Sequence, residues 1–191
     1  MKYKFVDNVT PAMFDVTKGA WLAQMEANAE NVSEPYYNAA LEYTERTAHG
    51  QLKMTDAGGC LCAVVEEGSE FASALLIVTH AKPKSEVRMM NVYVQPSLNL
   101  ANVEKPDYAA LAWIAATAIV GCLQLTYDRF PAKQLKIHTA IPLDAEFMSN
   151  VITTILLGMD SLSNLYDVSS HGNWLMVTKK DSDAKLKLVA N

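Results

Sequence analysis

The sequence SEVRMMNVYVQP, residues 85–96, decides the fold of this chain. Its apolar and β-branched residues predict a strand over Glu86–Val94 that ends before Pro96. The next ten residues, Ser97–Pro106, contain no glycine and lead into the uncharged run Tyr108–Tyr127. That run predicts a long helix over about 107–128. Arg129-Phe130-Pro131 ends it, because proline disfavours helix in the residue before it.

Upstream of this unit, the chain predicts one strand and then two helices. Tyr3–Asp7 alternates apolar and polar residues, as a half-buried strand does. Thr10-Pro11 places an N-cap residue before a proline and predicts a helix to about residue 28. Ser33 and Pro35 predict a second helix that ends near Ala48, before a glycine.

Three consecutive strands with short links predict an antiparallel meander. Cys60–Glu66 and Phe71–His80 are joined by a tight turn at 67–69, and a second turn at 82–84 leads into the strand that ends at Val94. In this last strand, strict alternation would place Met90 with Val92 and Val94, and Met89 with Asn91 and Tyr93. Both faces are apolar, so we expect a helix or a partner chain to cover each of them.

The C-terminal part predicts a further strand, a helix and a hairpin. Gln134–Thr139 is a strand, and Pro142–Leu157 is a helix closed by a glycine. Leu165–Val168 and Trp174–Lys179 form the hairpin. We expect one domain over residues 1–180 and a polar tail over 181–191.

Composition limits the function. Half of the 191 residues are hydrophobic and 19% are charged, which predicts a globular domain with a large core. The net charge of -5 and the scattered basic residues disfavour nucleic acid as a partner. The uncharged run is long enough to span a membrane, but its alanines and threonine favour a buried core helix, so we expect no membrane span. The N-terminus lacks an export signal, which favours a cytoplasmic protein.

The cysteines and histidines indicate structural roles. Cys60 and Cys62 share one strand face, and neither they nor Cys122 have the spacing of a metal site, so we expect core residues and no metal. His80 lies beside a predicted turn, which favours an exposed side chain. His138 lies in an apolar strand, where we expect it to be hydrogen-bonded.

The whole order of elements, β-α-α-β-β-β-α-β-α-β-β, resembles the GCN5-related N-acetyltransferase (GNAT) fold. This is an α/β (α+β) fold with a mixed, mostly antiparallel sheet of about six or seven strands and about four helices. Three segments are similar to the family's motifs: VQP at 94–96 to the end of its fourth strand, LGM at 157–159 to the end of its last helix, and Trp174–Lys179 to its terminal strand. In that family, acyl-CoA lies where the fourth and fifth strands splay apart.

Two functions are compatible with this resemblance. The first is acyl-CoA-dependent N-acetyl transfer with an atypical phosphate loop, for which acetyl-CoA is the implied cofactor. Glu86 or His80 would then take the proton of the amine, and Thr154 stands where the family often has a general-acid tyrosine. The implied cofactor-binding residues are Val92, Tyr93, Val94, Asn99, Ala101, Asn102 and Asp107.

The second function is non-catalytic, and the departures from the family pattern favour it. The family's glycines let backbone N–H groups turn toward a diphosphate at a helix N-terminus. Here no glycine stands in the connection, and Glu104 and Asp107 place negative charge where the diphosphate would lie. Threonine is also far too weak an acid to protonate a thiolate. On this interpretation the chain has no cofactor and acts as a structural or interaction protein with a protein partner or as a homo-oligomer.

The last hairpin carries a narrower resemblance. Residues 170–180, SHGNWLMVTKK, are similar to the last hairpin of the small acetyltransferase-like internal virion proteins of T7-like podoviruses, which also lack the glycine loop. The similarity suggests a bacteriophage virion or assembly component, located in the host cytoplasm or in the virion.

Overall fold

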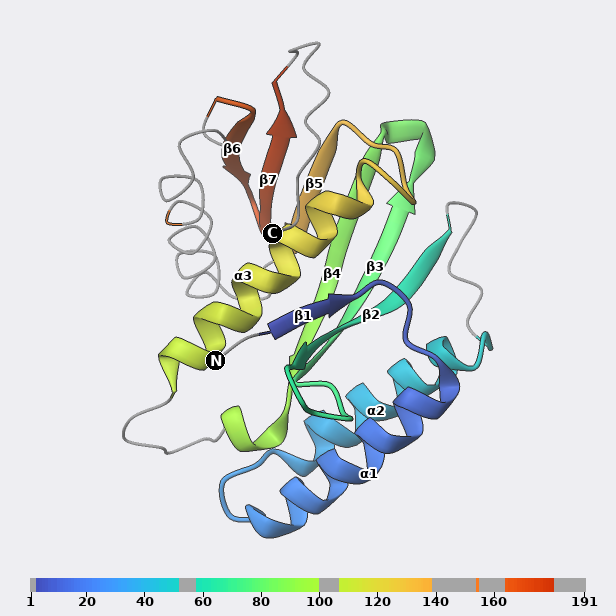
Figure 1. Ribbon diagram of the computed structural model, residues 1–191, viewed down its shortest axis with the longest axis vertical. Helices are drawn as coiled ribbons and strands as arrows, with labels where there is room; N and C mark the ends of the chain where they lie inside the picture. Colours follow the sequence, from blue (N-terminus) through green and yellow to red (C-terminus); the bar gives the residue numbers. More distant parts are fainter. Residues whose placement is uncertain (1–2, 52–57, 100–106, 139–153, 155–163, 181–191) are drawn as a thin grey trace.

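One β-sheet with helices on both faces forms the protein, shown as a computed structural model in Figure 1. The structure describes residues 3–51, 58–99, 107–138, 154 and 164–180. The strands are β1 (Tyr3–Val6), β2 (Gly59–Glu66), β3 (Ala74–Ala81), β4 (Glu86–Val94), β5 (Gln134–His138), β6 (Tyr166–His171) and β7 (Trp174–Lys179). The helices are α1 (Pro11–Ala27), α2 (Glu34–Ala48), α3 (Tyr108–Leu125) and two short 3-10 helices, Lys82–Lys84 and Pro96–Leu98.

The seven strands follow the order β1-β2-β3-β4-β5-β7-β6. Every pairing between neighbours is antiparallel except that of β4 with β5, which is parallel and is connected through α3. This order and the single parallel pair confirm the predicted GNAT-like α/β fold. The predicted helix Pro142–Leu157 lies outside the described residues, apart from the helical residue Thr154, and so does the predicted tail.

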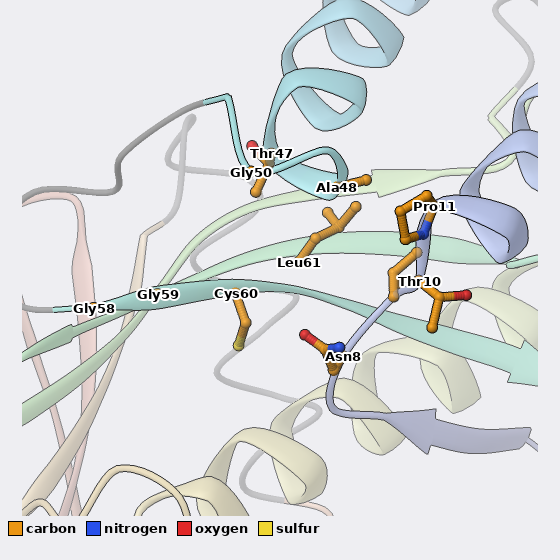
Figure 2. A pocket seen from close by; sticks show the side chains of 11 residues that line it. Asn8, Thr10, Pro11, Thr47, Ala48, Gly50, Gly58, Gly59, Cys60 and Leu61 are labelled. Carbon is orange, nitrogen blue, oxygen red and sulfur yellow. The ribbon is translucent and has the colours of Figure 1, made fainter.

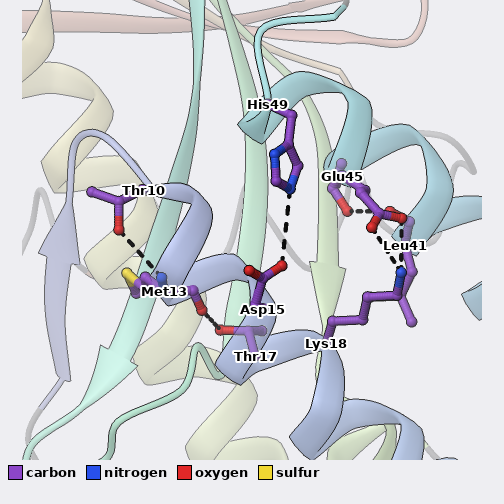
Figure 3. A network of polar contacts seen from close by, with 9 residues as sticks. Thr10, Met13, Asp15, Thr17, Lys18, Leu41, Glu45 and His49 are labelled. Carbon is purple, nitrogen blue, oxygen red and sulfur yellow. Dashed lines mark hydrogen bonds and ion pairs between the residues drawn. The ribbon is translucent and has the colours of Figure 1, made fainter.

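Local signals fix the starts of the first two helices, as predicted. The hydroxyl of Thr10 accepts a hydrogen bond from the Met13 amide at 3.2 Å, so it caps α1, and Pro11 occupies the first turn. Ser33 occupies the N-cap position of α2 without a capping bond from its side chain, and Pro35 lies in the first turn. The two helices are held together by Lys18, which donates to both carboxylate oxygens of Glu45 at 2.8 Å (Figure 3). This pair is partly exposed, so it adds little to stability compared with the packing beneath it.

β3 begins at Ala74 rather than at Phe71, because α1 binds the backbone that precedes it. The indole Nε1 of Trp21 donates to the Ala72 carbonyl at 2.8 Å, and the Thr17 hydroxyl accepts from the Ala72 amide at 3.0 Å. Both polar groups of Ala72 are therefore satisfied by side chains of α1 instead of by a strand. The turn predicted at 67–69 is present, with the Ser69 amide donating to the Glu66 carbonyl at 3.0 Å. Residues 70–73 lengthen the connection between this turn and β3.

Two further boundaries differ from the prediction. α3 ends at Leu125 instead of near residue 128, because the backbone amides of Thr126 and Tyr127 bond carbonyls three residues back, at 3.0 and 2.9 Å, and so tighten the last turn. The C-terminal hairpin is tighter than predicted, since β6 runs to His171 and only Gly172 and Asn173 form the turn. Gly172 has a φ of 56°, a conformation that glycine adopts without steric cost.

Helices cover both faces of the sheet, as the two apolar faces of β4 predicted. On one face α3 packs with Ile114 and Ile119 against Val64, Leu76 and Met89. On the other face α1 and α2 bury a second set of large side chains: Phe14, Trp21, Tyr37, Leu75 and Ile77. Each large side chain buried in this way stabilises the fold by roughly 1.5–3 kcal/mol relative to its exposed form.

α3 is long and apolar enough, by length and composition, to cross a membrane, and half of its apolar stretch is buried inside the protein. Its inner face packs on β1 to β4, as predicted for a core helix. Tyr108 and Trp113 on its outer face are 65% and 58% exposed. α3 therefore combines a buried face with an exposed and uncharged one.

The close approach of α3 to β1 predicts that Gly121→Ala destabilises the protein. A Cβ at Gly121 would overlap the ring of Phe5, whereas Gly19 in α1 has open space at its Cβ position. Alanine improves helix propensity at both sites, but the overlap outweighs this gain at Gly121. We expect Gly121→Ala to lower the free energy of unfolding by about 1–3 kcal/mol and Gly19→Ala to raise it by about 0.5–1 kcal/mol, as measured by urea unfolding. Equal effects of the two substitutions would contradict the packing of α3 on Phe5.

Candidate functional site

The divergence of β4 from β5 defines the candidate site. The two strands pair over only four positions, from Glu86 with Gln134 to Met89 with Ile137. β4 continues for five more residues, to Val94, while it remains paired with β3 on its other side. The edge of β4 from Met90 onward is therefore not paired with β5, as the GNAT resemblance implied.

A β-bulge at Met90 accompanies the divergence. Ile77 of β3 faces Asn91 and the next residue, Val78, faces Met89, so Met90 is an extra residue in β4. As a result Met89 packs on the same side as Val92 and Val94, beneath α3, while Met90 packs with Tyr93 against α1 and α2. The predicted alternation, with Met90 beside Val92, is therefore wrong.

The end of β4 is bonded to α2. The Tyr37 hydroxyl donates to the Val94 carbonyl at 2.8 Å and accepts from Nδ2 of Asn99 at 3.1 Å. Burial raises the pKa of Tyr37 to about 12, although the bond from Asn99 opposes the shift. The Tyr37 hydroxyl therefore stays protonated at neutral pH and remains a hydrogen-bond donor. It contacts Val94 and Asn99, two of the predicted cofactor-binding residues.

The other candidates on β4 are also engaged in packing. Tyr93 is 9% exposed and its hydroxyl accepts from Nδ2 of Asn91 at 2.6 Å. Val92 is half-buried and packs on the core beneath α3. Beyond the strand, the Gln95 amide donates to the Ser73 carbonyl at 2.9 Å, and the Ser97 amide donates to Oε1 of Gln24 at 3.1 Å. The first part of the connection to α3 is thus anchored to α1 and to the residue that precedes β3.

Asp107 caps α3. Its carboxylate accepts a hydrogen bond from the Ala110 amide at 2.9 Å, so it satisfies one of the free N–H groups at the helix start. It also places a negative charge at the positive end of the helix. Of the other predicted residues of the connection, Ala101, Asn102 and Glu104 lie outside the described residues.

Glu86 belongs to a buried ion cluster at the base of the β4–β5 pair. Its two carboxylate oxygens are 2.7 Å from Nη2 of Arg88 and 2.8 Å from Nζ of Lys136, and Gln134 donates to it at 3.0 Å. Burial alone would raise the pKa of Glu86, but the hydrogen bonds from Lys136 and Arg88 outweigh it and hold that pKa below its ordinary value. A carboxylate with two cationic partners is a poor acceptor for a substrate proton.

His80 and Thr154 are the remaining catalytic candidates. His80 is 8% exposed, so the expectation of an exposed turn histidine is wrong, and its ring stacks on Phe130 at 5.3 Å. The reason is that β3 extends to Ala81 and carries His80 into the sheet. Thr154 is exposed. His138 contacts the Trp174 ring at 4.9 Å, and its predicted hydrogen bond stays a prediction.

The three cysteines are buried and unpaired, as predicted for core residues. Within the described part of the chain, no group of three histidine, cysteine or acidic side chains could hold a metal ion. The expectation that the protein binds no metal stays a prediction.

A cavity lies at the other end of the sheet. It is lined by residues 8–11, by the end of α2 and by Gly58–Leu61 (Figure 2). Gly59 pairs with Thr79 and Thr79 with Arg88, so the cavity is level with the base of β4, far from Val94 along the strand.

Comparison with known proteins adds one structural relative. The chain is similar to an acetyltransferase from Agrobacterium tumefaciens str. C58, with 10% sequence identity, coverage of 95% of this chain and 94% of that chain, and a TM-score of 0.40. No protein-family model and no curated protein matches the sequence. The fold assignment rests on the strand order and the parallel β4–β5 pair.

Sequence reasoning missed Tyr37 and Gln24, which hold the start of the connection. Tyr37 stands 57 positions from Val94 and Gln24 stands 73 positions from Ser97. No local pattern marks such contacts. The adjacent tyrosines at the start of α2 are the only signal, and they are equally compatible with simple core packing.

The Tyr37 bonds predict a large effect of a very small substitution. Tyr37→Phe removes one hydroxyl and leaves the Val94 carbonyl and the Asn99 amide without their partner, so we expect a loss of about 1–2 kcal/mol in the free energy of unfolding. Tyr43→Phe, on the same helix and 40% exposed, is the matched control and should change stability by less than about 0.5 kcal/mol. Urea unfolding measures both, and a neutral Tyr37→Phe would refute the anchoring role.

Proposed function

We propose that this GNAT-fold protein has lost the coenzyme A diphosphate site and acts as a non-catalytic structural or interaction protein. The observation that carries this proposal is the cap of α3. In the family, a cofactor diphosphate takes the free N–H groups at this helix start. Here the Asp107 carboxylate already bonds the Ala110 amide and adds a negative charge that repels phosphate.

The approach to this helix supports the same proposal. Asn99 takes part in the Tyr37–Val94 contact, and the backbone at Ser97 is bonded to Gln24. The Val94 carbonyl, which would hold pantetheine in an active enzyme, accepts the Tyr37 hydroxyl instead. Cofactor binding would have to compete with each of these bonds.

The chemistry available for proton transfer is also weak. Glu86 is paired with Arg88 and Lys136, and Thr154 stands in place of a tyrosine. Neither side chain is suited to its implied role at neutral pH. The side chains implied for proton transfer therefore support the same non-catalytic role as the occupied cofactor site.

One observation favours the alternative, an acyl-CoA-dependent N-acetyltransferase with an atypical loop. The edge of β4 beyond Met89 is free of β5, which is the arrangement that receives pantetheine in the family. In this alternative acetyl-CoA binds along β4, and the phosphates lie against the part of the connection that follows Asn99.

An interaction role is supported by the surface of α3. Tyr108 and Trp113 are large, exposed side chains on a helix that has no charged residue. Exposed aromatic groups of this kind are enriched where proteins associate. The resemblance of residues 170–180 to the virion proteins makes a phage particle or its assembly the proposed setting.

Calorimetry with acetyl-CoA tests the proposal. We expect no binding heat and no rise in melting temperature with millimolar ligand, because the Asp107 carboxylate already takes the Ala110 amide and repels a diphosphate at the start of α3. Mass measured by light scattering under the same conditions addresses association. A single 21.0-kDa species that binds acetyl-CoA with micromolar Kd would overturn the proposal in favour of the enzyme.

A further inference from the structure

Two buried thiols lie in direct contact at the start of β2. The Sγ atoms of Cys60 and Cys62 are 3.4 Å apart, on the face of the strand that packs beneath α3. Cys62 is 0% exposed and Cys60 is 5% exposed. Cys122, the third cysteine, is fully buried in α3.

The cavity described above distinguishes the three thiols. Cys60 belongs to the wall of the cavity of about 340 Å³ described above, and Cys62 and Cys122 do not. In Figure 2 the Cys60 side chain points to the side of β2 on which Asn8 lies, away from Ala48. Of the three cysteines, Cys60 is therefore the one that a small molecule in this cavity could contact.

The surroundings of the pair distinguish the two sulfur atoms. The hydrogen bond with Cys62 lowers the pKa of Cys60, burial opposes this shift, and the Arg129 guanidinium adds to the lowering. The same hydrogen bond, together with burial, raises the pKa of Cys62. Cys60 is thus the more acidic thiol and Cys62 is its protonated neighbour, which also lies 3.5 Å from the Asp7 carbonyl.

We propose that Cys60 and Cys62 form a reactive dithiol site whose substrates are low-molecular-weight disulfides such as glutathione disulfide. The Cys60 thiolate attacks one sulfur of glutathione disulfide, forms a mixed disulfide and releases one glutathione thiolate. The Cys62 thiol then transfers its proton to the glutathione thiolate released in the first step and attacks Sγ of Cys60, which releases the second glutathione as a thiolate that takes a proton from water. The dithiol is oxidised to a disulfide and glutathione disulfide is reduced to two glutathiones.

The second step requires a local movement of β2. A disulfide needs the two sulfur atoms at about 2.05 Å, so the strand must bend at Leu61. The Leu61 carbonyl accepts a hydrogen bond from the Val9 amide at 2.8 Å, just before α1. Oxidation should therefore weaken this bond and speed hydrogen exchange at Val9.

Mass spectrometry of the native full-length chain treated with glutathione disulfide tests the site. We expect the peptide with Cys60 and Cys62 to lose two hydrogens while Cys122 stays free. Cys62→Ser should stop at a mixed disulfide on Cys60, and Cys60→Ser should react at least about tenfold more slowly. Cys122→Ser is the matched control and should react like the natural chain.

Because the pKa of Cys60 is lowered, the reaction should persist below pH of about 8.5, the ordinary thiol pKa.

Two results would overturn the proposal. One is a natural chain that keeps all three thiols in the native state and loses them only in denaturant. The other is a Cys60→Ser variant that reacts as fast as the natural chain. The measurement on the natural chain needs no substitution, so it decides the question even where a variant fails to fold.

Discussion

The parallel pairing of β4 with β5 is the interaction on which the rest of the structure depends. A parallel pair cannot be joined by a hairpin, so the chain must return to the same end of the sheet through a crossover, which α3 provides. The pair covers four positions and ends at the bulge at Met90. The same short ladder therefore fixes the place of α3 and frees the edge of β4.

The side chains around this edge distinguish the protein from an acetyltransferase with the same fold. In an acetyltransferase, the free edge and the start of the crossover helix together hold the cofactor. Here the helix start is taken by Asp107, and the end of β4 is taken by Tyr37. Both contacts are intramolecular, so a ligand would have to displace Asp107 from the Ala110 amide and Tyr37 from the Val94 carbonyl. In the described part of the chain, β4 thus diverges from β5 as in the family, while the Val94 carbonyl and the Ala110 amide are bonded to side chains of the protein itself.

Much of the fold could be predicted from the sequence because its signals are local. The start of α1 follows from Thr10-Pro11, and the bounds of β4 follow from its apolar residues before Pro96. The start of β3 could not be predicted, because it depends on bonds from Trp21 and Thr17 to Ala72. These contacts join residues more than fifty positions apart, and no pattern along the chain marks them.

The candidate site was harder to predict than the fold for the same reason. The sequence indicated the missing glycines and the charge at Asp107, which are local features. It did not indicate the bulge at Met90, the burial of His80 or the partners of Glu86, which arise only when β3, β4 and β5 come together. The environments of these side chains therefore depend on how the strands pair, which the sequence does not show locally.

The occupied start of α3 can be observed directly by an NMR titration of the isotopically labelled full-length chain with coenzyme A. The reporter is the Ala110 amide, which donates to Asp107. A closed diphosphate site predicts that this resonance does not move, even with millimolar ligand. A saturable shift of the Ala110 resonance with a micromolar Kd would show that a diphosphate displaces Asp107, and it would contradict the loss of the cofactor site.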